Sequence, residues 1–450
     1  MQPTTVTIIG AGPAGSLMGI LLARRGFAPM VYERRADMRR TEMAAGRSIN
    51  LALADRGLHA LDRAGVLESV RSLMIPMRGR LLHDLNGVTS LQRYGKDDTE
   101  VIYSISRGEL NKRLMTEYER ISAIAIRFRQ SCRGADFARG TLTMLDEQTD
   151  STYELTTSPV IGADGASSAL REEMTQAGLS RGSEDVLSHR YKELSIAPGA
   201  GGGHQLDANA LHIWPRGGFM LIALPNIDGS FTATLFLPAQ GPESFESLTT
   251  PLIVQKFFAR HFPDVVSLIP DLDGDFFTHP TGAMVTVRSA PWHVGDKLLL
   301  IGDAAHAIVP FHGQGMNCAF EDCVALSELV DRHMLWETVF DEFERARKPN
   351  ADAIAKMALE NYVEMRDTVR HPKFQLQQAL SLELEREHPQ HFIPRYSMVM
   401  FHHEIPYLRA LERGRLQQQL LDDLCEGVDR IDQVNWGKAA ALVRTRLPKL

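Results

Sequence analysis

The chain has 450 residues, of which 44% are hydrophobic and 23% are charged, and its formal net charge is −7. This length predicts about two or three domains, and the composition is that of an ordinary globular protein. The mild acidic excess gives no reason to expect nucleic acid as a partner. Four scattered cysteines without zinc-type spacing argue against a disulfide framework and against a metal site. No apolar run is long enough to cross a bilayer, so we expect a cytoplasmic protein without a membrane anchor.

The chain opens with the pattern of a strand, a glycine loop, a helix and a second strand. Residues 6–9 are a β-branched apolar run, residues 16–25 are expected to be helical, and residues 28–32 form a strand that ends at Glu33. The loop between the first strand and the helix is Gly10-Ala11-Gly12-Pro13-Ala14-Gly15. This arrangement predicts a βαβ unit that begins at the N-terminus.

The glycine loop matches the pattern that binds dinucleotides. Gly10 permits the tight turn, Gly12 lets the backbone approach a pyrophosphate, and Gly15 allows the helix to pack closely on the strand. Glu33 can accept hydrogen bonds from a ribose hydroxyl. A glycine turn in any βα unit is the alternative, but the strand, the helix and Glu33 all favour dinucleotide binding.

The next elements alternate in type. A helical pattern covers residues 51–74, and a second helix is expected at residues 110–121. Strands are expected at residues 77–83, 101–105, 124–129 and 141–145.

The middle of the chain has the pattern of a sheet and the end that of helices. Strands are expected at residues 211–214, 219–224 and 231–236, and since few helical patterns separate them, an antiparallel sheet is favoured. A buried strand at 298–301 follows, and beyond Glu321 the sequence turns helical to its end.

Two further motifs distinguish FAD from NAD. Residues 161–165, Ile-Gly-Ala-Asp-Gly, place Asp164 at the end of a strand. Residues 302–306, Gly-Asp-Ala-Ala-His, place Asp303 where it can accept a hydrogen bond from a ribityl hydroxyl. The glycines at 313 and 315 precede a helix whose N-terminus can offset negative charge on a reduced flavin.

In this order the three motifs resemble the single-component FAD-dependent aromatic hydroxylases, whose fold is that of para-hydroxybenzoate hydroxylase. The resemblance covers about the first four-fifths of the chain. It implies an α/β fold with a discontinuous Rossmann-like FAD-binding domain, a mostly antiparallel β-sheet substrate domain and a C-terminal helical region. The expected boundaries are 1–75, 101–180 and 290–365 for the FAD-binding domain, 76–100 and 181–289 for the substrate domain, and 366–450 for the helical region.

Further stretches resemble the kynurenine 3-monooxygenase family more closely. They lie at residues 47–53, 77–80, 94–95, 310–317, 360–365 and 392–398. The resemblance implies that NADPH reduces bound FAD and that O₂ then supplies the oxygen for hydroxylating L-kynurenine at ring position 3, in tryptophan degradation. Because the flavin performs this chemistry, no catalytic side chain and no metal are expected.

The resemblance also implies the substrate site. Arg80, with Tyr94, is expected to bind the substrate carboxylate, and Asn361 and Tyr396 to lie at its amino-acid end. Met365 shares a helix face with Asn361. The ring is expected to contact Ile222, Leu224, Phe236, Phe311 and His312. For Arg80 the alternative is a solvated surface arginine, and for the apolar residues it is simple core packing.

The residues expected to bind the cofactor come from all three motifs and from positions matched to the family. They are Gly10, Gly12, Ala14, Gly15, Glu33, Arg34, Asn50, Arg107, Asp164, Asp303, Gly315, Met316 and Asn317.

Two other functions are compatible with the same motifs. One is a flavin hydroxylase for another aromatic acid, and the other is an FAD-bound protein without turnover. The C-terminal helices are expected either to cap the substrate pocket or to form a homodimer interface. A second GxGxxG motif is not apparent, so NADPH is expected to bind transiently.

Overall fold

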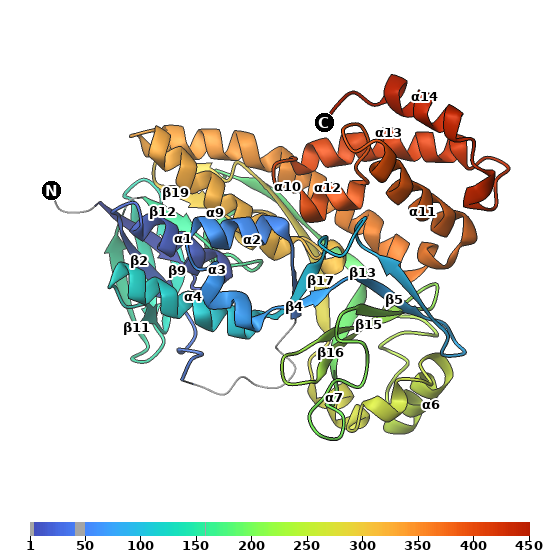
Figure 1. Cartoon of the computed structure of the whole chain (residues 1–450). Helices are drawn as coiled ribbons and strands as arrows, with labels where there is room; N and C mark the ends of the chain where they lie inside the picture. Colours follow the sequence, from blue (N-terminus) through green and yellow to red (C-terminus); the bar gives the residue numbers. More distant parts are fainter. Residues whose placement is uncertain (1–3, 41–49, 158) are drawn as a thin grey trace. The chain divides into compact units, whose positions relative to one another are not determined.

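The computed structural model describes residues 4–40, 50–157 and 159–450 (Figure 1). The expected family stretch at 47–53 therefore lies partly outside the described residues. The chain divides into two compact units. The first unit comprises Met1–Met74, Ile105–Leu187 and Val285–Ala355, and the second comprises Ile75–Ser104, Ser188–Met284 and Lys356–Leu450.

A six-stranded sheet forms the centre of the first unit. Its order is β18-β19-β12-β1-β2-β8, and every pair is parallel except β18 with β19. The strands are β1 (Thr5–Ile9), β2 (Ala28–Glu33), β8 (Arg127–Phe128), β12 (Val160–Gly162), β18 (His293–Val294) and β19 (Leu298–Leu300). The apolar side chains of the central strands β1, β12 and β19 are buried, as in parallel sheets covered by helices. The expected βαβ opening is confirmed.

Three helices of the first unit pack on one another beside this sheet. Helix α1 (Pro13–Ala23) contacts α4 (Arg107–Ser122) and α9 (Gly315–Arg332). Helix α4 begins at Ser106, whose hydroxyl accepts a hydrogen bond from the backbone N–H of Glu109. The remaining elements of this unit are the antiparallel strands β9 (Gln130–Asp136), β10 (Thr141–Asp146) and β11 (Ser151–Thr156) and the helices α5 (Ala169–Gln176), α8 (Asp303–His306) and η3 (Pro310–His312).

Two expected elements were wrong in extent. Residues 51–74 are not one helix but β3 (Asn50–Leu53), α2 (Asp55–Arg63), α3 (Leu67–Val70) and the short η1 (Arg71–Leu73). Gly65 has a φ of +64°, which ends α2 before the chain can continue as a helix. The strand expected at 124–129 is only β8, since Arg129 has a φ of +59°.

The sheet of the second unit is mostly antiparallel, as expected. Its order is β17-β13-β16-β15-β14-β5-β6, and β14 pairs with β5 in parallel. The strands are β5 (Gly79–His83), β6 (Thr89–Arg93), β13 (Arg181–Ile196), β14 (Leu211–Pro215), β15 (Met220–Pro225), β16 (Phe231–Pro238) and β17 (Gly282–Ala290). β13 and β17 continue in sequence into the first unit. Strands β4 (Ile75–Met77) and β7 (Ile102–Ser106) pair antiparallel in a separate three-stranded sheet of order β3-β7-β4.

The register of this sheet separates two faces. Leu221, Ala223 and Leu235 belong to a core that includes residues of α6 (Pro251–His261) and α7 (Leu272–Thr278). Side chains alternate along a strand and directly paired residues share a face. Arg80, Ile222, Leu224 and Phe236 therefore project from the opposite face.

The expected single strand at 77–83 is interrupted at Arg78, between β4 and β5. Arg78 is exposed whereas Arg80 is 6% exposed, so the two arginines do not share an environment.

Helices form the C-terminal region, as expected. They are α10 (Trp336–Arg366), η4 (Thr368–Arg370), α11 (Pro372–Glu387), α12 (Arg395–Phe401), α13 (Tyr407–Leu424), η5 (Ile431–Gln433) and α14 (Trp436–Arg446). In Figure 1, α11, α13 and α14 lie side by side, and their apolar faces share one core. Across the described ranges, no helix has both the length and the apolar composition to cross a membrane.

The sheet core predicts a position-dependent cost of truncation. Leu235→Ala, in the centre of β16 with 0% exposure, is expected to lower the free energy of unfolding by about 2–5 kcal/mol. Leu91→Ala, on edge strand β6 with 43% exposure, should change it by about 0.5 kcal/mol or less. Urea denaturation of both variants checks this, and equal losses would contradict the assignment of the core face.

Candidate functional site

The glycine loop of the first unit is held by backbone contacts that only glycine permits. Gly10 has a φ of +104°, and a Cβ there would lie 2.4 Å from the carbonyl oxygen of Ala163. A Cβ on Gly15 would lie 1.9 Å from the carbonyl oxygen of Gly10. Among the described residues, no atom other than those of its chain neighbours lies within 4 Å of the position of a Cβ on Gly12, which caps the N-terminus of α1 without a side-chain hydrogen bond. The N-terminus of α1 therefore has room beside Gly12 for a phosphate, and its first N–H groups are the donors that such a group needs.

Glu33 joins the loop to the end of β2. One carboxylate oxygen accepts the Ala11 N–H at 2.9 Å, and the other accepts the backbone N–H and Nε–H of Arg35. Burial by itself raises the pKa of Glu33, but the hydrogen bonds and charge of Arg35 outweigh it and hold the pKa below its ordinary 4.5. Glu33 is therefore an anionic acceptor at the strand end, where a ribose is expected.

One carboxylate oxygen of Asp164 is buried and accepts no hydrogen bond from the described residues. Its Oδ2 accepts the Leu170 N–H at 3.4 Å, whereas its Oδ1 is shielded from solvent and has no hydrogen-bond partner among the described residues. Burial raises the pKa of this carboxyl. A buried orphan acceptor calls for a donor from a ligand, and a flavin-nucleotide hydroxyl fits that chemistry.

The three motifs meet in the first unit. Gly10 lies against Ala163, and a Cβ on Gly302 would lie 3.6 Å from the Cβ of Ala14. Arg171, which is buried, donates to the carbonyl oxygens of Ala166 and Ala304 and so connects the second motif with the third. The three motifs, which are far apart in the sequence, are therefore neighbours in the first unit.

The turn that presents Asp303 depends on Asp322 of α9. The Asp322 carboxylate is fully buried and accepts three N–H groups: Gly302 N at 3.0 Å, His306 Nε2 at 2.6 Å and Arg347 Nε at 2.7 Å. Burial by itself raises the pKa of a carboxyl, but His306 and Arg347 outweigh it and lower the pKa of Asp322 to about 2. No local sequence signal indicated Asp322 or Arg347, because their partners are distant in the chain.

Asn317 is committed to protein partners. Its Oδ1 accepts the Ala54 N–H, and its Nδ2 donates to the carbonyl oxygens of Ala52 and Gly313. Asn317 therefore ties β3 to the start of α9. Of the other positions expected to contact the cofactor, Gly315 and Met316 are half-buried, Asn50 is buried, and Arg34 and Arg107 are exposed.

In the second unit, three of the expected substrate residues, Tyr94, Asn361 and Tyr396, lie around the fourth, Arg80. The guanidinium donates to Glu364 Oε1 at 2.8 Å and to Asn361 Oδ1 at 3.2 Å, whereas its buried Nε–H has no partner within the described ranges. The rings of Tyr94 and Tyr396 stack with centroids 5.4 Å apart, and the Arg80 guanidinium lies 4.9 Å from the centre of the Tyr396 ring. We name Arg80, Tyr94, Asn361, Glu364 and Tyr396 the arginine cluster.

The cluster is electrostatically balanced. Burial lowers the pKa of Arg80, but Tyr396 and Glu364 outweigh it and keep the pKa above its ordinary value. Burial raises the pKa of Tyr396 to about 12, and that of Tyr94 well above 10, so both hydroxyls stay protonated. Glu364 was missed in the sequence, although it lies three residues after Asn361 on the same helix, where the two side chains are neighbours.

The remaining expected substrate residues are divided between the units. Met365 is buried, and its sulfur accepts a hydrogen bond from Asn361 Nδ2 at 3.4 Å. Ile222, Leu224 and Phe236 lie on the same sheet face as Arg80, away from the main core. Phe311 and His312 are buried in η3 of the first unit.

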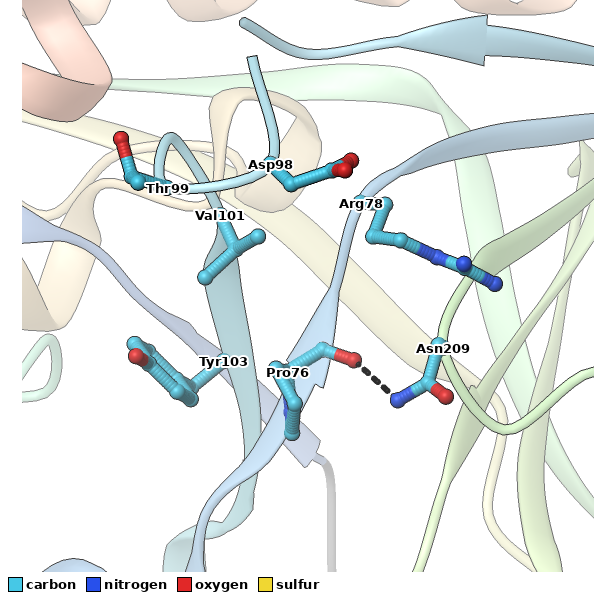
Figure 2. Close-up of a pocket in the computed structure, with 7 residues that line it drawn as sticks. All are labelled: Pro76, Arg78, Asp98, Thr99, Val101, Tyr103 and Asn209. Atoms are coloured by element: carbon cyan, nitrogen blue, oxygen red, sulfur yellow. Dashed lines mark hydrogen bonds between the residues drawn. The ribbon is translucent and has the colours of Figure 1, made fainter.

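Arg78 is not part of the arginine cluster but lines a pocket of about 430 Å³ (Figure 2). Figure 2 shows the polar groups of Arg78, Asp98 and Asn209 around it, with Asn209 Nδ2 donating to the carbonyl oxygen of Pro76 at 2.8 Å. None of the expected substrate residues lines this pocket. Arg78 is therefore an exposed arginine only two residues from the buried Arg80, and it suits a control substitution.

The Asp322 network predicts a large loss of stability when its acceptor is removed. Asp322→Ala leaves His306 buried without its carboxylate and Arg347 with Glu321 alone, and it should lower the free energy of unfolding by about 3–5 kcal/mol. Because the pKa of Asp322 is lowered, its contribution is complete above the ordinary 3.8 and is lost as the pH falls toward 2. Guanidinium denaturation checks this, with Asp331→Ala on the exposed side of α9 as control. Equal stability of the two variants would contradict it.

Comparisons with known proteins agree with this geometry. The profile of a family described as FAD binding domain matches residues 3–358. The chain is 51% identical over 443 residues to the kynurenine 3-monooxygenase of Myxococcus xanthus (98% of this chain, 95% of that one). It is 48% identical over 450 residues to that of Stenotrophomonas maltophilia (99% and 98%).

Solved structures share the fold at lower identity. A 2-methyl-3-hydroxypyridine-5-carboxylic acid oxygenase has a TM-score of 0.67 at 20% identity, covering 85% of this chain and 96% of that one. The p-nitrophenol 4-monooxygenase PnpA of Pseudomonas putida has a TM-score of 0.65 at 15% identity, covering 96% and 100%. The expected α/β flavin-hydroxylase fold is thus confirmed, and the chain belongs to the kynurenine 3-monooxygenase family.

Proposed function

We propose that the chain is an FAD-dependent monooxygenase that converts L-kynurenine to 3-hydroxykynurenine with NADPH and O₂. The observation that carries this proposal is the buried arginine cluster, which combines one cation, one anion and two neutral hydroxyls. The reaction belongs to tryptophan degradation. We further propose that the enzyme acts in the cytoplasm and that any self-association is as a homodimer.

The residues of the first unit fit FAD. The open N-terminus of α1 suits the pyrophosphate, Glu33 suits a ribose, and the orphan Oδ1 of Asp164 suits a hydroxyl of the nucleotide. Asp303 and the N-terminus of α9 would lie toward the flavin end. Bound FAD would take electrons from NADPH and activate O₂ for insertion of one oxygen atom into the ring.

The arginine cluster suits the amino-acid end of kynurenine. The unpartnered Nε–H of Arg80 and the protonated hydroxyls of Tyr94 and Tyr396 can donate to the substrate carboxylate. Glu364 and Asn361 Oδ1 can accept from the α-ammonium. The protein's part is to hold this end of the substrate so that its ring is oriented.

The charge of the cluster favours an amino acid over a simple aromatic acid. The Arg80–Glu364 pair is neutral, and a zwitterion adds no net charge to the buried site. A hydroxybenzoate would bring a carboxylate without an ammonium, and Glu364 would then face a second anion in a low-dielectric region.

The apolar face of the sheet suits the aniline ring. Ile222, Leu224 and Phe236 lie on the same face as Arg80 and offer apolar contact that excludes water. Phe311, His312 and Met365 stay predicted contacts. The aniline nitrogen makes the adjacent ring carbon electron-rich, so the substrate needs no strong side-chain base.

The direct test is product identification. Purified protein with FAD, NADPH, O₂ and L-kynurenine should form 3-hydroxykynurenine, detected by mass spectrometry, and L-kynurenine should accelerate NADPH oxidation. Acceleration by a phenolic acid but not by L-kynurenine would identify a hydroxylase of another aromatic acid. A protein that retains flavin but does not oxidise NADPH with any of the ring substrates would instead be a non-catalytic FAD-binding protein.

Arg80→Ala is expected to raise the KM for L-kynurenine roughly 30- to 150-fold with FAD still bound, because about 2–3 kcal/mol of charged hydrogen bonding is lost. Arg78→Ala, two residues away and exposed, should leave KM within about twofold. Steady-state kinetics at saturating NADPH compare the two. An unchanged KM in Arg80→Ala would remove Arg80 from the substrate site.

Glu33→Ala is expected to weaken FAD retention about tenfold or more, because the loop loses an anionic acceptor at the ribose position. Flavin absorbance after gel filtration measures retention. Glu68→Ala, a carboxylate with a 79% exposed side chain, is the control. Full retention in Glu33→Ala would contradict the ribose role.

A further inference from the structure

Glu385, near the end of α11, is a carboxylate in an unusual state. Its side chain is 0% exposed, and neither carboxylate oxygen has a hydrogen-bond partner among the described residues. The Lys96 ammonium is a nearby cation, at 3.6 Å from Oε1. An ionised carboxylate without donors is costly to bury, so this geometry favours the neutral acid.

Lys96 is already committed to a second carboxylate. Its ammonium lies 2.8 Å from Glu100 Oε1, and its backbone N–H donates to Glu100 Oε2 at 2.9 Å. One ammonium thus faces two carboxylates, and Asp97 adds a third negative charge nearby. A ring nitrogen of His402 and carboxylate oxygens of Glu100 and Glu385 all lie within 4.8 Å of one another.

Burial, and then the charge of Glu100, raise the pKa of Glu385 from 4.5 to about 7. Arg386, the next residue on α11, does not neutralise it, because its guanidinium pairs with Glu383 and donates to the Lys96 carbonyl oxygen. The geometry and the pKa therefore agree that Glu385 holds a proton into the neutral range.

The loop that meets Glu385 is the one that carries Tyr94. Gly95 lets the Glu100 side chain lie across the backbone, since a Cβ there would be 2.2 Å from the Glu100 Cβ. Tyr94 directly precedes this turn and stacks on Tyr396 at the start of α12. A change in charge at Glu385 thus acts within two residues of a hydroxyl in the arginine cluster.

We propose that Glu385 is protonated near neutral pH and in that form positions residues 94–100, so that Tyr94 is placed for substrate binding. The role of Tyr94 rests on the proposed function; the protonation of Glu385 does not. When Glu385 ionises, it competes with the half-buried carboxylate of Glu100 for Lys96, and the repulsion between the two carboxylates opens the contact between α11 and the loop. Glu385 is therefore a positioning residue that makes substrate affinity depend on pH.

Glu385→Gln, a neutral side chain of the same shape, is the test variant in the full-length FAD-bound protein. The wild-type Kd for L-kynurenine, measured by calorimetry, should rise about tenfold more than that of Glu385→Gln between about pH 6 and about pH 8, as the protonated fraction falls. Comparing the two proteins cancels the titration of the substrate itself. Glu387→Gln, an exposed residue of the same helix, should follow the wild type.

The substrate-free proteins give a second readout. Because the folded-state pKa is raised, the contribution of Glu385 to stability is complete below 4.5 and is lost as the pH rises through about 7. The Tm of Glu385→Gln relative to wild type should therefore increase over that interval and then level. Glu100→Gln removes the competing carboxylate and leaves Lys96 to pair with ionised Glu385 alone, so the pH dependence of the affinity should largely disappear in this variant.

The outcomes separate the proposals. Parallel Tm profiles of wild type and Glu385→Gln would overturn the protonation of Glu385. Divergent Tm profiles with parallel affinity profiles would overturn its positioning role. Failure of L-kynurenine to bind any of the proteins, with divergent Tm profiles, would overturn the proposed function and the positioning role but leave the protonation supported.

Discussion

The guanidinium of Arg80 is a buried positive charge, and much of the second unit is arranged to make that charge tolerable. A charge removed from water must be paired and hydrogen-bonded, and Arg80 obtains Glu364 and Asn361 from α10 and two aromatic rings from the β6–loop segment and α12. Segments hundreds of residues apart in sequence are thereby held at one point. Because the Arg80 Nε–H has no partner in the part of the chain that the structure describes, the pairing is strong but incomplete, which is the state expected of a site that receives a ligand.

The first unit contains a buried negative charge, which likewise has to be paired and hydrogen-bonded. The Asp322 carboxylate is fully buried and is satisfied by one backbone N–H and two cationic or polar side chains. Its backbone partner, Gly302, precedes Asp303 in a turn with a φ of +57°. Asp322, twenty residues after Gly302, thus fixes the conformation of the turn that presents Asp303. The glycine loop, in contrast, is held by backbone contacts, both within the loop and with Ala163.

This difference explains which parts could be predicted from sequence. The pattern of strand, glycine loop, helix and strand depends mainly on local spacing, so the elements of residues 6–33 were predicted to within about three residues. The helix expected at 51–74 was wrong, because β3 is set by Asn317, more than two hundred residues later, and because Gly65 adopts a left-handed conformation. Arg80 could be named only by resemblance, since strand alternation placed Arg78 beside it and burial is a tertiary property. Glu364 could have been found from its helix spacing to Asn361, whereas Asp322 and Arg347 had no local signal.

The charges of buried ionisable groups in the second unit are compensated or suppressed in three different ways. The way determines whether the group changes its charge near neutral pH. Arg80 is neutralised by a carboxylate, so its state does not change near neutral pH, and a zwitterion can be added without a net charge. Tyr94 and Tyr396 stay neutral because burial raises their pKa values beyond the neutral range. Glu385 is neutralised by a proton. Of the three kinds of group, it is the one that exchanges its proton with solvent at a pH near 7. The constant charges therefore lie where the substrate is to be recognised, and the variable one lies beside the loop that adjusts a single hydroxyl of that site.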